Sequence, residues 1–260
     1  MSKLTIDLDE KFENFPHAPI VEAVIDIRAS TSTMPAEDTL KAELSQRLED
    51  YEFLDSMQNV RIQQHISIKS SGDAEPLVSE VTWKGLRFQS KDKKHIAQFN
   101  RDGFVFSRLQ PYLSWEQLFE EGMRLWAVYA ELTKPVEVGR IGLRYINRIL
   151  LPEGEVLLED YLKSSPQPPI GLELPFVGFL HQDTLAVPGY PYAVNIIKTL
   201  QEPAADHPQR SGLIVDIDSF TTDTCAPDEL LLKKRLMEMR WVKNKVFFGS
   251  FAENAWKLFR

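Results

Sequence analysis

The sequence predicts an α+β fold, in which two similar β-α-β-meander-α units form one curved antiparallel sheet with long helices on one face. Such an architecture is of the saddle or helix-grip type. Three observations predict it. Two segments, 20–28 and 138–149, alternate apolar and charged residues with period two, which is typical of strands with one buried face. Short strands separated by turn signals follow each segment, and each half closes with a long helix.

The first half opens with the strand 20–28, where Pro19 precedes an apolar face of Val21, Ala23, Ile25 and Ile27. A helix over 36–51 follows, because leucines recur every four residues. A meander is expected next, with a tight turn at Asp102-Gly103. Its strands are predicted at 60–68, 78–89, 95–100 and 104–109. A capping box of Ser114 and Gln117 then starts a helix that ends by Thr133.

The second half opens with the strand 138–149, whose apolar face consists of Ile141, Leu143, Tyr145 and Ile149. Arginines at 140, 144 and 148 share the opposite parity. A short helix over 157–162 is expected next, and strands over 176–187, 192–200 and 212–218. A long helix over 227–248 follows, with Gly249 as its C-terminal cap. Ser250 and Glu253 are expected to cap a terminal helix.

The same order of elements in both halves predicts an internal repeat. The first unit spans residues 1–134 and the second spans residues 135–260. Identity between the two halves is slight, so the repeat is predicted from the pattern of elements. We expect the two units to form one continuous structural domain.

Composition excludes several classes of protein. Of 260 residues, 43% are hydrophobic and 26% charged, which is ordinary for a globular chain and excludes a disordered one. A net charge of −8 argues against a protein that coats nucleic acid with its whole surface. The single cysteine excludes a disulfide framework. No apolar run is long enough for a membrane span or a leader, so a cytoplasmic location is expected.

Charged residues on the two opening strands are the candidate site. If these strands lie side by side, Glu22 and Asp26 face Arg140 and Arg144, and cross-strand pairing explains the charges. The alternative is an arginine-lined groove that binds phosphate or carboxylate, for which guanidinium is well shaped. The candidate ligand-binding residues are Glu22, Asp26, Arg28, Arg140, Arg144 and Arg148.

Motifs of known catalytic chemistry are missing from the sequence. No glycine-rich phosphate loop, G-x-S-x-G elbow or H-E-x-x-H pair occurs. The five histidines are scattered. The alternating charges of 22–28 resemble those of triphosphate-tunnel enzymes only loosely, because such enzymes use a denser alternation across many strands. We therefore predict no catalytic residue, no metal ligand and no cofactor.

The segments Pro19-Ile20-Val21-Glu22-Ala23 and Gly142-Leu143-Arg144-Tyr145-Ile146-Asn147-Arg148 resemble the hallmark segments of a sporadically distributed bacterial and archaeal family without established function. The strands between them and the closing helix also fit, so the resemblance covers nearly the whole chain. It supplies no catalytic residues. The patchy distribution of such a family implies an accessory gene, for example in a mobile defence or toxin–antitoxin locus.

These observations predict a non-enzymatic binding protein with a protein partner. The alternative is a phosphate-directed enzyme or a binder of an anionic small molecule that uses the arginine strand. Nucleic-acid binding is disfavoured by the net charge of −8. No membrane contact is expected, and the sequence leaves the oligomeric state open.

Overall fold

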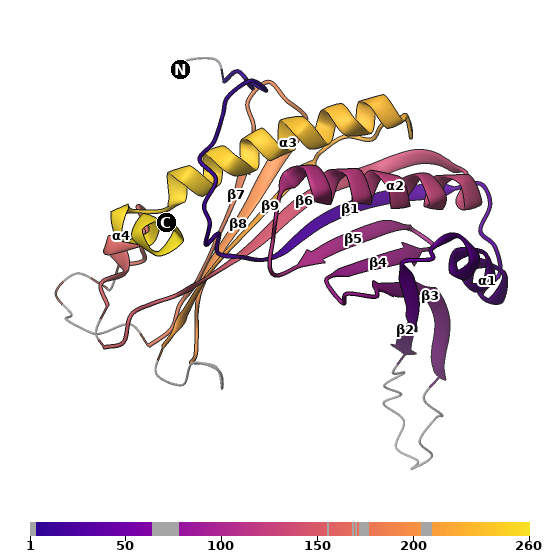
Figure 1. Cartoon of the computed structure of the whole chain (residues 1–260), viewed down its shortest axis with the longest axis horizontal. Helices are drawn as coiled ribbons and strands as arrows, with labels where there is room; N and C mark the ends of the chain where they lie inside the picture. The colour runs from indigo at the N-terminus through magenta and orange to yellow at the C-terminus, as the bar shows by residue number, and fades with distance from the viewer. Residues whose placement is uncertain are drawn as a thin grey trace, which may run out of the picture.

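The computed structural model describes residues 4–63, 78–154, 156–167, 169, 171, 177–203 and 210–260. Within these ranges the chain forms an α+β fold with a nine-stranded antiparallel sheet and four α-helices (Figure 1). The strand order is β2-β3-β4-β5-β1-β6-β9-β8-β7, and the sheet does not close into a barrel. The predicted fold class and antiparallel sheet are therefore confirmed.

The elements of the first part of the chain surround the strand β1. In chain order they are β1 (Ile20–Thr31), α1 (Glu37–Arg47), β2 (Tyr51–Gln63), β3 (Val78–Ser90), β4 (His95–Asn100), β5 (Gly103–Leu109) and α2 (Trp115–Thr133). The remaining elements follow from the strand β6. They are β6 (Pro135–Leu150), the 3-10 helix η1 (Leu158–Asp160), β7 (Leu180–Ala186), β8 (Tyr192–Gln201), β9 (Gly212–Thr221), α3 (Glu229–Ser250) and α4 (Glu253–Phe259).

The two alternating segments are the central, adjacent strands of the sheet. β1 pairs antiparallel with β6, and Ile25 lies opposite Leu143 while Ile27 lies opposite Ile141. All four of these side chains are buried. Because side chains alternate across a strand, the charged residues between them lie on the other face. The predicted parity of both segments is thus confirmed.

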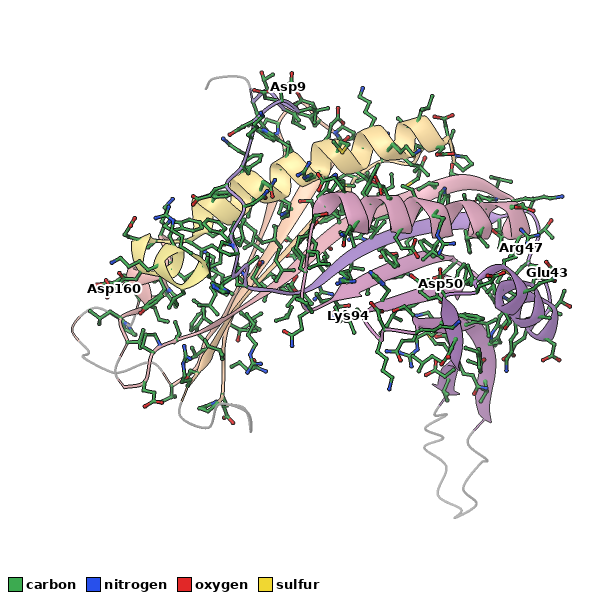
Figure 2. All side chains as sticks on the ribbon, in the orientation of Figure 1. Asp9, Glu43, Arg47, Asp50, Lys94 and Asp160 are labelled. Atoms are coloured by element: carbon green, nitrogen blue, oxygen red, sulfur yellow. The ribbon has the colours of Figure 1, made fainter. Side chains whose placement is uncertain are left out.

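Helices α2 and α3 lie on the same face of the sheet (Figure 1). Side chains fill the space between these helices and the strands (Figure 2). On α2, Trp126 and Tyr129 pack against the ring of Phe104 on β5, with ring centroids 6.4 and 6.1 Å away. The helix starts as predicted, since the Ser114 hydroxyl accepts a hydrogen bond from the Gln117 amide at 3.3 Å. These aromatic side chains of α2 are therefore part of the core.

Several predicted boundaries were wrong. The first helix ends at Arg47, and Tyr51 begins β2 because it pairs with Ser90 and donates a hydrogen bond to Glu121. Gly249 lies inside α3, which ends at Ser250. Ser250 does not cap α4, because its hydroxyl donates back to the Val246 carbonyl at 2.7 Å.

Parts of two predicted strands, residues 64–68 and residue 176, lie outside the described residues. β7 begins at Leu180, four residues after the predicted start. In the described ranges, no helix is both long and apolar enough to cross a membrane.

Candidate functional site

A groove of about 430 Å³ lies at the centre of the sheet, and its lining residues place it on the face away from the helices. The side of β1 that faces the helices is identified by Gly122 of α2, which lies against the Ile25 side chain. Residues of opposite parity therefore line the groove. We call it the charged groove. Its charged lining residues are Glu22, Asp26 and Arg28 of β1, Arg140 and Arg144 of β6, and Asp218 of β9.

Arg140 occupies the centre of the charged groove. Its Nη1 donates to Asp26 Oδ2 at 3.1 Å, and its Nη2 donates to Asp218 Oδ2 at 2.7 Å. The guanidinium can reach both carboxylates because it lies across Gly142, where a Cβ atom would collide with it. Its Cζ also lies 5.0 Å from the Phe220 ring centroid. One arginine thus joins β1 to β9 across β6.

Arg144 is paired with Asp216 of β9. Its Nε donates to Oδ1 at 2.9 Å, and its Nη2 donates to Oδ2 at 2.5 Å, which is a bidentate arrangement. The hydrogen bonds to Asp216 raise the pKa of Arg144 above its usual value. The sequence had placed Glu22 or Asp26 opposite Arg144. Asp216 takes that role because β9 is the neighbour of β6 on the other side.

Arg28 and Glu22 mark the two ends of the groove on β1. Arg28 Nε donates to Asp26 Oδ2 at 3.2 Å, and Nη1 donates to Asp102 Oδ2 at 3.2 Å. Burial lowers the pKa of Arg28, but the two carboxylates outweigh it and the pKa is raised. Glu22 forms no ion pair within the described part of the chain. Its negative charge nevertheless contributes to the raised pKa of Arg144.

The carboxylates of Asp26, Asp216 and Asp218 are less accessible than the arginines that they bind, whereas Asp102 is more exposed than Arg28. The Asp216 side chain is 9% exposed and the Arg144 side chain 46% exposed. Burial raises the pKa of Asp218, although Arg140 and Arg144 oppose that shift. Guanidinium groups therefore form the solvent-facing layer of the groove, and carboxylates hold them from below.

Arg148 does not line the charged groove. It lines a separate hollow of about 670 Å³, together with Arg210 and the segment 16–21 that leads into β1. The predicted strip of four arginines is therefore divided. Arg28, Arg140 and Arg144 are brought together, and Arg148 lies at another site.

Two residues of the site were missed from the sequence, Asp216 and Asp218. Both lie in the segment 212–218 that was correctly predicted as a strand, and their spacing of two places them on one face. That spacing was a usable signal. Strand order was needed to show that this face adjoins the arginines of β6.

The groove is equipped for recognition by charge. Each of its three arginines is bonded to at least one carboxylate. Among its described lining residues, the groups that could act as a base or nucleophile are the carboxylates of Glu22, Asp26 and Asp218 and the hydroxyl of Ser107. Over the described residues, no three histidine, cysteine or carboxylate side chains gather where they could hold a metal ion.

Comparisons with protein-family models, with curated proteins and with solved structures found no match for this chain. The resemblance of the two opening strands to a bacterial and archaeal family therefore stays a prediction.

Proposed function

We propose that this chain is a binding protein that holds a protein partner on the open face of its sheet, centred on the charged groove. The observation that supports this most is the layer of partly exposed arginines over partly buried carboxylates. Arg28 and Arg144 side chains are 40% and 46% exposed. Arginine is enriched in the parts of protein surfaces that bind other proteins.

The charge balance favours a polypeptide partner over a small anion. Arg140 and Arg144 already donate to Asp26, Asp218 and Asp216. A phosphate would have to displace these carboxylates, which would leave Asp216 buried and the half-buried Asp26 and Asp218 unpaired. A protein surface that carries charges of both signs can bind the outer edges of the same arginines without that cost.

We further propose that the halves 1–134 and 135–260 are structural repeats. The order of strands around the sheet supports this, since β1 and β6 are its two adjacent central strands. β5 flanks β1 and precedes α2, while β9 flanks β6 and precedes α3. A groove formed between two related units has residues from both at its centre, as Asp26 and Arg140 are here.

Site-specific photo-crosslinking in the native cells tests the binding proposal. A photoreactive residue would replace Val105, which lines the groove, and in a second protein Leu230, which is 77% exposed on α3. We expect a discrete crosslinked protein from position 105 and none from position 230. Adding Gly142→Ala, which displaces Arg140, should abolish that product while the protein stays folded.

Equal products from the two positions, or none from position 105, would contradict the proposal. Calorimetric titration with inorganic phosphate and ATP addresses the alternative. Binding of either that Arg144→Ala abolishes would replace the protein partner with an anionic ligand.

A further inference from the structure

A third cavity lies on the side of the sheet opposite the charged groove, between the start of α2 and the C-terminal part of α3. It has a volume of about 220 Å³. The N-terminal arm (residues 4–19) covers it, and Ile20 of β1, Tyr145 of β6, the start of α2 and residues 240–248 of α3 complete its walls. Pockets for drug-sized ligands hold about 300–1,000 Å³. This cavity therefore suits a smaller molecule. We call it the Lys243 cavity.

Lys243 is the buried polar group of this cavity. The residue is 8% exposed, and its Nζ lies 3.9 Å from the centroid of the Tyr145 ring. Among the described residues, Nζ has no carboxylate, carbonyl or hydroxyl partner within hydrogen-bonding distance. An ammonium group on a largely buried side chain loses much of its hydration, and without such a partner this loss is costly. Burial, and to a smaller extent Arg240, lower the pKa of Lys243 to about 7.

The other charged groups around Lys243 leave one positive charge uncompensated. Arg240 stacks on Trp115, with Cζ 5.3 Å from the ring centroid, and its Nη2 lies 3.7 Å from Glu116. Glu13, on the arm, is bonded to Arg260 at 3.2 Å. The first turn of α2, capped by Ser114, adds the positive end of a 19-residue helix. A bound group with one negative charge would complete this balance.

The remaining walls are largely aromatic, and the polar side chains of Asn14, Ser114 and Asn244 also line the cavity. The aromatic residues are Phe12 and Phe15 of the arm, Trp115 of α2, Tyr112 and Tyr145, and Phe247 and Phe248 of α3. The hydroxyl groups of Tyr112 and Tyr145 are hydrogen-bonded to each other at 3.1 Å, and the rings of both residues line the cavity. Burial raises the pKa of Tyr112 to about 12, and that of Tyr145 is also raised, so neither competes with a ligand for the cation.

We propose that the Lys243 cavity is a binding site for a small organic carboxylate with a flat apolar body. The carboxylate pairs with the Lys243 ammonium, and the body packs between the aromatic rings. A monoanion fits better than a phosphate dianion, because Glu116 already offsets the charge of Arg240. This site is separate from the charged groove, and either proposal can fail without the other.

Isothermal titration calorimetry with benzoate as the probe tests this inference, with benzamide as the neutral analogue of the same shape. Binding of the anion should draw a proton onto Lys243. From its pKa of about 7, we expect uptake of about 0.9 proton per benzoate at pH 8 and about 0.1 at pH 6. Titrations in two buffers of different ionisation enthalpy measure this uptake in the wild-type chain.

The matched variants are Lys243→Met, which removes the charge at nearly constant volume, and Lys234→Met on the exposed side of the same helix. We expect Lys243→Met to weaken benzoate binding at least tenfold and Lys234→Met to leave it unchanged. Equal binding of benzamide, absence of proton uptake, or no binding of benzoate at millimolar concentration would each overturn the proposal. The proton uptake and the benzamide comparison do not depend on the folding of a variant.

Discussion

Replacing Lys243 with methionine should make the protein more stable at neutral pH and remove part of its pH dependence. The pKa of Lys243 falls from its ordinary value of 10.5 to about 7 on folding. The unfolded chain therefore binds this proton more tightly than the folded chain, and stability must rise with pH between these two values. The linkage relation gives a cost of about 4 kcal/mol at pH 7 and about 2 kcal/mol at pH 9.

The wild-type chain should accordingly gain about 2 kcal/mol from Lys243 between pH 7 and pH 9, and the Lys243→Met chain should lack that gain. At pH 7 the variant should be more stable by about 1–4 kcal/mol, as is found when buried charges are replaced by apolar groups of similar volume. Urea unfolding at pH 7, 8 and 9 measures both effects, with Lys234→Met as the control. Parallel pH profiles for wild type and Lys243→Met would refute the reasoning.

Three further substitutions test other parts of the structure. Arg140→Met should destabilise the chain by about 1–3 kcal/mol, because Asp26 and Asp218 lose their shared partner. Adding Asp218→Asn should recover part of this loss in urea unfolding. No recovery would contradict the bridging role of Arg140. Gly103→Ala should lower the free energy of unfolding by more than about 2 kcal/mol, because Gly103 has φ +146° and an added Cβ would collide with the neighbouring strand β1. Gly139→Ala should be nearly neutral, because there is open space around Gly139. Similar losses of stability for the two variants, measured by thermal or urea unfolding, would contradict this prediction. Phe15→Ala should lower the free energy of unfolding by about 2–3 kcal/mol, because the Phe15 ring packs on three other aromatic rings. Unfolding followed by fluorescence measures this loss. A transition that matches wild type would show that the arm is not docked.

Local patterns were enough for most elements of this chain. The alternation in 20–28 and 138–149 predicted the two central strands, and the capping residue Ser114 predicted the first residue of α2. Ends that depend on distant partners were predicted poorly. Tyr51 reads as the last residue of a helix, yet it starts β2 because Ser90, far along the chain, supplies its pairing partner.

The charged site was predicted in part. Asp26 and Arg140 were expected to meet, and they do, at 3.1 Å. Arg144 was assigned to the acidic residues of β1, but Asp216 of β9 binds it. β1 and β9 both flank β6, so alternation alone allows acidic residues of either strand as the partner of Arg144. Only the register of three adjacent strands decides between them.

Outside that groove, Lys243 lies within a helix that was correctly predicted, yet nothing in its local sequence distinguishes it from neighbouring lysines. Its burial depends on the N-terminal arm, more than 200 residues away, which crosses α3 and is held by a hydrogen bond of 2.7 Å from Trp241 to Glu10. The sequence thus allowed charge pairing to be predicted in the groove, but it gave no sign that Lys243 is buried in the cavity.

By itself, the sequence determined which residues share a face, because the periods of strand and helix follow from the local geometry of the backbone. It thereby determined the α+β class, the buried side of β1 and β6, and the arginines on the opposite side. The tertiary structure decided which carboxylate binds which arginine, why Arg148 lies apart, and which lysine is enclosed. Those outcomes depend on strand order, register and the path of the arm, all of which involve contacts between residues far apart in the chain.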